Sequence, residues 1–191
     1  MRIGPLLSLL FIAAAASALW WLETLRDPDP REVADPAEAR APAAYFEAFR
    51  ASAWDGDGPP RHVIRGERMT QFTAGGESDI ERPEIHYRDP HGPVWLVVSD
   101  HGRVDAAGEH IELRGRVVAT REPHAPEPLV LRTPSLAVLL AAGRAETSDA
   151  VDVVSAGTRL QAQGVTATFE TGLVELHHHV RGQYEPAVRS R

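Results

Sequence analysis

Residues 165–169 have the sequence Val-Thr-Ala-Thr-Phe, and this short stretch decides the fold class. Its apolar side chains alternate with two threonines. Because successive side chains of a β-strand point to opposite faces, the alternation places valine, alanine and phenylalanine on one face and the threonines on the other. The stretch therefore predicts a strand with one buried face and one face in solvent.

The same alternation recurs upstream, in residues 111–113 (Ile-Glu-Leu) and 117–119 (Val-Val-Ala). Glycine-containing turns such as residues 55–58 (Asp-Gly-Asp-Gly) and 171–172 (Thr-Gly) separate the runs. No stretch after residue 44 carries a convincing helical stripe. Many short antiparallel strands at this spacing predict an all-β sandwich, barrel or jelly roll. The expected strands are residues 61–72, 80–87, 94–99, 110–120, 129–133, 136–140, 151–155, 158–163, 165–169 and 173–184.

A hydrophobic segment precedes the strand region. Residues 3–22 (IGPLLSLLFIAAAASALWWL) contain no charged side chain. As a helix rising about 1.5 Å per residue they would span roughly 30 Å, the thickness of the hydrocarbon core of a bilayer. Trp20 and Trp21 stand at the end where indole rings favour the headgroup region. Since Arg2 precedes the segment and Glu23 follows it, the positive-inside rule predicts a transmembrane helix with a cytoplasmic N-terminus.

The same segment also fits a cleaved signal peptide. Residues 16–18 (Ala-Ser-Ala) match the small-x-small cleavage pattern, and cleavage there would make Leu19 the first mature residue. The retained helix is favoured because Trp20 and Trp21 would form an odd mature N-terminus. Under either interpretation the remainder of the chain is exported.

Proline content and charge divide the chain into four parts. Residues 1–22 are expected to form the anchor. Residues 23–44 hold four prolines among Asp, Glu, Arg and Ala without an apolar stripe, which predicts an extended linker. Residues 45–186 are expected to form a single β domain, and residues 187–191 a short tail.

Charge and composition exclude several classes of function. The net charge is −7, with acidic and basic residues interspersed. This argues against nucleic acid as a partner, because phosphate binding needs a concentrated basic face. Cysteine is absent, so the chain has no disulfide framework, no thiolate nucleophile and no lipoprotein anchor.

No catalytic motif accompanies the strands. The sequence lacks the G-x-S-x-G elbow of serine hydrolases and the glycine-rich motifs of nucleotide-binding proteins. Residues 177–179 are three consecutive histidines, but on a strand only His177 and His179 share a face, so at most two could hold one metal. A solvent-facing strand is the favoured interpretation. We therefore expect no enzymatic activity, no cofactor and no metal.

The apolar face of these strands has two possible uses. It can be a packed core or a hydrophobic groove, and for each residue singly the packed core is the simpler interpretation. The strand at residues 173–184 is the last long one, so we expect one of its sides to lack a neighbour within the chain. Such an unpaired edge invites another strand to pair with it.

Features found in order along the chain resemble one known family. They are the anchor with almost no cytoplasmic extension, residues 81–87 (ERPEIHY) followed by 93–95 (PVW) and 99–100 (SD), residues 111–118 (IELRGRVV), the segment from 132–134 (RTP) to 147–149 (TSD), and the segment from 163–165 (QGV) to 180–185 (VRGQYE). Together they cover residues 3 to about 186. In this order and spacing they resemble LptC, the inner-membrane component of the lipopolysaccharide export bridge.

The resemblance implies an open, twisted β-jelly roll whose hydrophobic interior receives the acyl chains of lipopolysaccharide. Members of the family stand beside an ATP-driven extractor, an ABC transporter of the LptB, LptF and LptG type. They pass lipid to a soluble periplasmic bridge protein of the LptA type. The helix would lie in the inner membrane and the domain in the periplasm. A membrane-anchored periplasmic adaptor that binds only protein, without a lipid-carrying groove, is the alternative.

The resemblance also implies roles for particular residues. Those expected to face the interior and contact lipid are Ile64, Ile85, Trp95, Val97, Leu113, Val117, Leu131, Val153, Leu160, Ala167 and Phe169. The expected partner edge, to which the soluble protein would add a strand through backbone hydrogen bonds, carries Leu173, Val174, Leu176, Val180 and Tyr184.

Overall fold

The computed structural model describes residues 41–54, 56–72 and 76–184, and these form one antiparallel sheet of 11 strands. No helix occurs among them, which confirms the all-β prediction. The predicted anchor, most of the linker and the tail lie outside the described residues. None of the described segments forms a helix that is long and apolar enough to cross a membrane.

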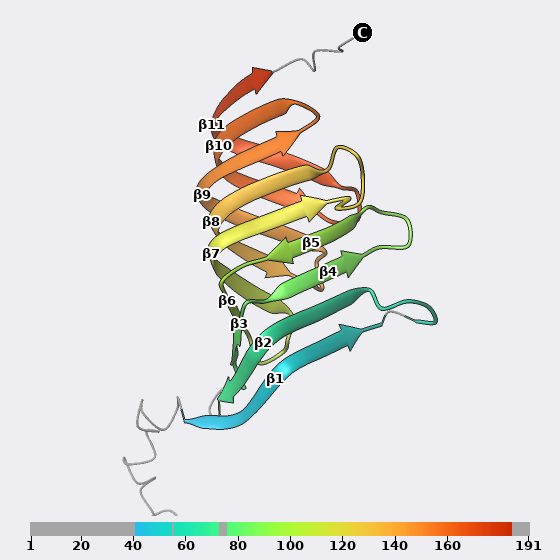
Figure 1. The fold of residues 1–191 in the computed structure, drawn as a ribbon, viewed down its shortest axis with the longest axis vertical. Helices are drawn as coiled ribbons and strands as arrows, with labels where there is room; N and C mark the ends of the chain where they lie inside the picture. Colours follow the sequence, from blue (N-terminus) through green and yellow to red (C-terminus); the bar gives the residue numbers. More distant parts are fainter. Residues whose placement is uncertain (1–40, 55, 73–75, 185–191) are drawn as a thin grey trace, which may run out of the picture. The chain divides into compact units, whose positions relative to one another are not determined.

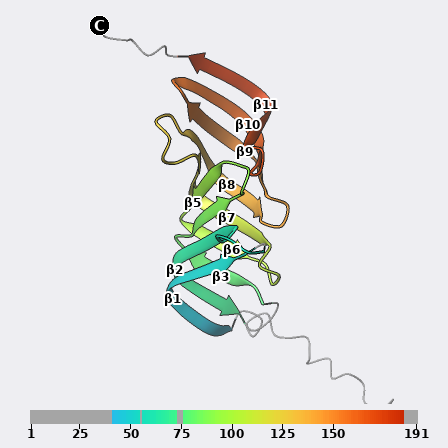
Figure 2. The same cartoon turned by 90° about the vertical axis from the view of Figure 1, so that its right-hand side faces the viewer.

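The strands follow one another with short connections. Figure 1 shows them stacked in a column from β1 to β11, and Figure 2 shows the same column from the side. Their bounds are β1 (Pro42–Ala53), β2 (His62–Phe72), β3 (Ser78–Glu81), β4 (Glu84–Arg88), β5 (Val94–Val98), β6 (His101–Val104), β7 (His110–Arg121), β8 (Leu129–Leu139), β9 (Arg144–Ser155), β10 (Thr158–Thr168) and β11 (Leu173–Tyr184).

The long strands bend, so that the two halves of one strand belong to two different layers of the sheet. The first half of β7 pairs with β6 and its second half with β5, while β8 runs along both halves on the other side. In the same way β2 pairs first with β4 and then with β3. The sheet is therefore folded over, with β4 and β5 in one layer and β3 and β6 in the other. Because β1 and β11 remain as edges, the fold is the predicted open jelly roll.

The bend between the layers lies where the strand ladders shift register. One shift in the β7–β8 ladder falls between Arg114 and Val117, and the residue at the bend is Gly115, whose φ is 74°. Beside it Arg116 donates to Asp100 at 2.7 Å, and this hydrogen bond is the main reason that the pKa of Asp100 is lowered. A β-carbon on Gly115 would stand 2.7 Å from the Asp100 carboxylate. Glycine is therefore required at this bend.

Several predicted strand boundaries differ from the observed ones. The predicted strand at residues 80–87 is two strands, because Arg82, at φ 49°, and Pro83 turn the chain from one layer into the other. Conversely, β8 continues through Pro134 and β10 through Gly164, where the sequence predicted breaks. The breaks were expected from residues that in fact bend a continuous strand.

Two strands were not predicted. β6 is a short four-residue strand, His-Gly-Arg-Val, without a recognisable pattern. β1 begins at Pro42, three residues inside the predicted linker, so the predicted start of the domain at Tyr45 was late. Ala48 in this strand has a φ of 47°, which shifts the inward-facing positions along the strand. The apolar residues of β1 therefore do not follow a simple alternation in the sequence.

The bend at Gly115 can be tested by comparing two alanine substitutions. Gly108 also has a positive φ (73°), but a β-carbon there would meet nothing within 4 Å. Both substitutions strain the backbone, and only Gly115→Ala also displaces Asp100. We expect Gly115→Ala to lower the free energy of unfolding by roughly 1–3 kcal/mol more than Gly108→Ala, measured by urea denaturation. Equal losses would show that the contact with Asp100 is unimportant.

Candidate functional site

The two layers enclose one continuous apolar interior. Ten of the eleven predicted interior residues are buried, with exposed fractions of 0–8%. The eleventh, Leu160, is half-buried and packs against the same cluster. This burial agrees with the expectation that the side chains face inward, and their contact with lipid stays a prediction. Further buried members of the cluster are absent from the list of predicted interior residues, although Ile111 and Val165 lie in the alternating stretches quoted above. On β7–β10 they are Ile111, Leu136, Val138, Ala145, Val151 and Val165.

A cavity that opens to solvent lies at the β1 end of the interior. It has a volume of about 300 Å³ and is bordered by β1, β2, β3 and the turn between β6 and β7. Small side chains leave this space open, among them Ala51, Ala53 and Ala106, and Met69 and Ile80 supply much of the apolar wall. An unbranched apolar chain is the kind of group that such a wall can shelter.

His62 also borders the cavity but adds no charge to it near neutral pH. Its Nδ1 atom is buried without a hydrogen-bond partner among the described residues. Burial, and secondarily the positive charge of Arg61, lower the pKa of His62 below its usual value. The imidazole is therefore neutral at pH 7, and the cavity remains suited to an apolar group.

At the opposite end of the column, β11 is an edge strand. It pairs with β10 and, among the described strands, with no other. Among the described strands this agrees with the expectation of an unpaired last strand, and partner binding there stays a prediction. The five residues predicted for this edge do not share one face. Val174 and Leu176 pack against the core, whereas Leu173 lies opposite Thr168 and points outward, with an exposed fraction of 54%.

The middle of the interior is filled by an aromatic cluster. The ring of Phe169 lies 4.7 Å from that of Tyr87 and 5.5 Å from that of Trp95, measured between centroids. All three side chains are at most 1% exposed. Tyr87 and Trp95 belong to β4 and β5, while Phe169 follows β10. The cluster thus joins the two layers at the centre of the column.

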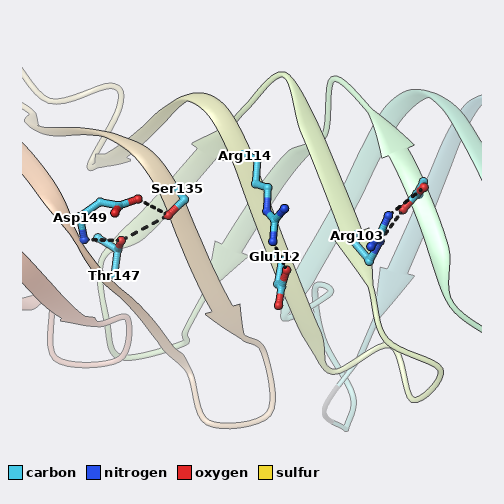
Figure 3. A network of polar contacts seen from close by, with 7 residues as sticks. Arg103, Glu112, Arg114, Ser135, Thr147 and Asp149 are labelled. Carbon is cyan, nitrogen blue, oxygen red and sulfur yellow. Dashed lines mark hydrogen bonds and ion pairs between the residues drawn. The ribbon is translucent and has the colours of Figure 1, made fainter.

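Polar side chains on the outer faces of several strands pair with one another. Figure 3 shows Arg103 bonded to its acidic neighbour and Arg114 beside Glu112, at 2.9 and 3.0 Å respectively. Ser135 donates to Asp149 at 2.5 Å where the ladder between β8 and β9 is interrupted. The three histidines of residues 177–179 are exposed, and within the described ranges no cluster of metal-ligating side chains was found.

Comparison with known proteins identifies the family. A family model described as lipopolysaccharide-assembly, LptC-related, matches residues 7–185. The chain belongs to the LptC family. This confirms the resemblance seen in the sequence and places the protein in lipopolysaccharide assembly. No curated protein matches the sequence.

A solved structure supports the architecture. The crystal structure of LptH from Pseudomonas aeruginosa, described as the LptA homologous periplasmic component of the conserved lipopolysaccharide transport device, superposes with a TM-score of 0.51. The two sequences are 10% identical, and the match covers 65% of this chain and 95% of LptH. At this identity the likeness concerns the fold alone. It agrees with an LptC-family domain built as an open jelly roll.

The packing of the aromatic cluster can be tested with two substitutions at the same turn. Phe169 is buried and Leu173 is exposed. We expect Phe169→Ala to lower the free energy of unfolding by about 3–5 kcal/mol, because the deletion leaves a cavity in the core. Leu173→Ala should change it by less than about 0.5 kcal/mol, as at most surface positions. Chemical denaturation of both variants measures the difference, and a small loss for Phe169→Ala would contradict the core assignment.

Proposed function

We propose that this LptC-family protein carries lipopolysaccharide across the periplasm with its acyl chains held between the two layers. It would receive the lipid from an ABC transporter of the LptB, LptF and LptG type and pass it to a soluble protein of the LptA type. The observation that carries the proposal is the single apolar interior. It extends from the cavity at β1 to the half-buried residues Leu160 on β10 and Val174 and Leu176 on β11.

The physical requirement for such a carrier is continuous shelter. Each methylene moved from water into an apolar environment gains about 0.8 kcal/mol, so an acyl chain resists leaving the membrane unless a protein covers it along its path. The inward-facing residues supply that cover. Because most of them pack closely against one another, the layers must separate to admit lipid.

The two unpaired edges suggest where lipid enters and leaves. β1 follows the predicted anchor in the chain, so we assign its end to the inner-membrane transporter. β11 lies at the far end of the sheet order and is assigned to the soluble partner. An edge strand can extend its sheet into that of another jelly roll through backbone hydrogen bonds, which would continue the apolar interior across the joint. We accordingly place the helix in the inner membrane and the domain in the periplasm.

One observation favours the alternative of a protein-binding adaptor. The predicted lipid-facing residues other than Leu160 are at most 8% exposed, as in an ordinary core. An adaptor would use only its edges and would never open. The two functions differ in whether lipid contacts inward-facing side chains.

Photocrosslinking from neighbouring positions of β10 separates these functions. Leu160 is half-buried and packs against the interior, while Gln161 is exposed on the other face. With a photoreactive residue at each position in turn, in membranes that contain the transporter and lipopolysaccharide, we expect ATP-dependent crosslinks to lipid from position 160 and at least about ten-fold fewer from position 161. Equal yields, or none from a folded protein labelled at 160, would favour the adaptor.

The partner edge can be tested with proline, which removes a backbone donor. Val180→Pro should abolish capture of the soluble partner in a pull-down, while circular dichroism and protease resistance remain those of the unmodified domain. Ala44→Pro is the matched control, because it lies near the start of β1 at the opposite edge. Undiminished capture by folded Val180→Pro protein would place the junction elsewhere.

A further inference from the structure

On the side of the fold opposite the strand bends, the two layers meet around Phe169. There the turn after β10 meets the loop between β4 and β5. The indole N–H of Trp95 donates to the carbonyl oxygen of Phe169 at 3.2 Å, and Arg121 donates to the carbonyl oxygen of Gly172 at 2.6 Å. We call this contact, formed by residues 89–95 and 169–172 with Arg121, the clasp.

The clasp leaves no space between the layers. A β-carbon on Gly92 would stand 2.2 Å from the carbonyl oxygen of Glu170, and one on Gly172 would stand 2.8 Å from the Pro93 ring. The backbones are thus in direct contact. Behind them, the ring of Phe169 closes the interior against Tyr87 and Trp95. A lipid cannot lie across this point while the contact is intact.

The position of the clasp matters for an amphiphilic cargo. The cavity lies among β1, β2 and β3, whereas Leu160 and Leu176 lie on β10 and β11. The clasp joins the β4–β5 loop to the β10–β11 turn, so it spans the open side between these two ends. A lipid whose chains travel inside must keep its polar head outside, because burying unpaired polar and charged groups is costly. The head must therefore move along the open side and past the clasp.

We infer that the clasp is a gate, which opens each time a lipid passes from the β1 end to the β11 end. The inference rests on the proposed function. Its construction permits opening without unfolding, since the paired strand ladders lie within the layers and do not cross this side. The polar bonds found across it are the two made by Trp95 and Arg121, and Glu170 and Thr171 of the turn are exposed.

A disulfide across the clasp tests the gate. Since the sequence contains no cysteine, Pro93→Cys with Gly172→Cys supplies the only thiol pair, and the two positions are in contact, because a β-carbon on Gly172 would stand 2.8 Å from Cγ of the Pro93 ring. Thiol titration after oxidation verifies that the disulfide has formed. The full-length protein is assembled with the transporter in membranes and given purified lipopolysaccharide and ATP. A photoreactive residue at Met69 reports lipid at the cavity, and one at Leu160 reports arrival at the far end. The single-cysteine variants control for strain at Gly172, whose φ is 70°.

We expect oxidation to leave the Met69 crosslink intact and to reduce the Leu160 crosslink at least ten-fold, with recovery on reduction. An unchanged Leu160 crosslink in the oxidised protein would overturn the gate and leave the proposed function standing. Absence of lipid at both positions in the reduced protein would overturn the proposed function itself, and the gate with it.

A second variant keeps the test independent of the disulfide. Arg121→Met removes the donor to Gly172 and retains an unbranched side chain, so the gate should open more readily and lipid should reach Leu160 at least two-fold faster. Arg132→Met, at an exposed position on β8, is the matched control. Equal rates for the two variants would contradict the gate.

Discussion

The fold depends on one constraint, that a strand must turn from one layer into the other without losing its backbone hydrogen bonds. On β7, β8 and β10 a bulge allows this turn, and the strand ladders shift register there. The backbone φ is positive at Gly115 on β7 and at Gly164 on β10. The Asp100–Arg116 pair holds the outside of the bend at β7. The layers are thereby covalently continuous along one side, and along the other they meet through side chains and turns. The interior can therefore be reached from the side where the layers meet through side chains and turns.

Alternation along the chain was sufficient to predict the fold class and part of the buried core. Val117, Leu131 and Ala167 are buried as expected because a half-buried strand leaves a period-two pattern. Bends leave no such pattern. The sequence therefore predicts strand ends at Pro134 and Gly164, whereas both lie within strands that continue past the bend. The sequence does not predict β1 either, because the positive φ of Ala48 changes the face that points inward and interrupts the alternation.

The candidate site was only partly predictable. The pattern identified Phe169 as a core residue, but its partners Trp95 and Tyr87 are 74 and 82 positions away in the chain, and their meeting depends on how the layers are folded together. The edge at β11 could be expected because it is the last strand. Which of its side chains face inward could not, because the bulge near Val180 and the register with β10 decide it.

The order of the strands also has a kinetic consequence. From β7 to β11 every strand pairs with its predecessor, so this half of the domain is a series of hairpins with local contacts. The pairings of β2 with β4 and of β3 with β6 close longer loops. Contacts of low sequence separation form faster, because less chain entropy is lost before they are made. The hairpins from β7 to β11 can therefore form early, whereas β7 can complete the two layers only when both β5 and β6 are in place to pair with it.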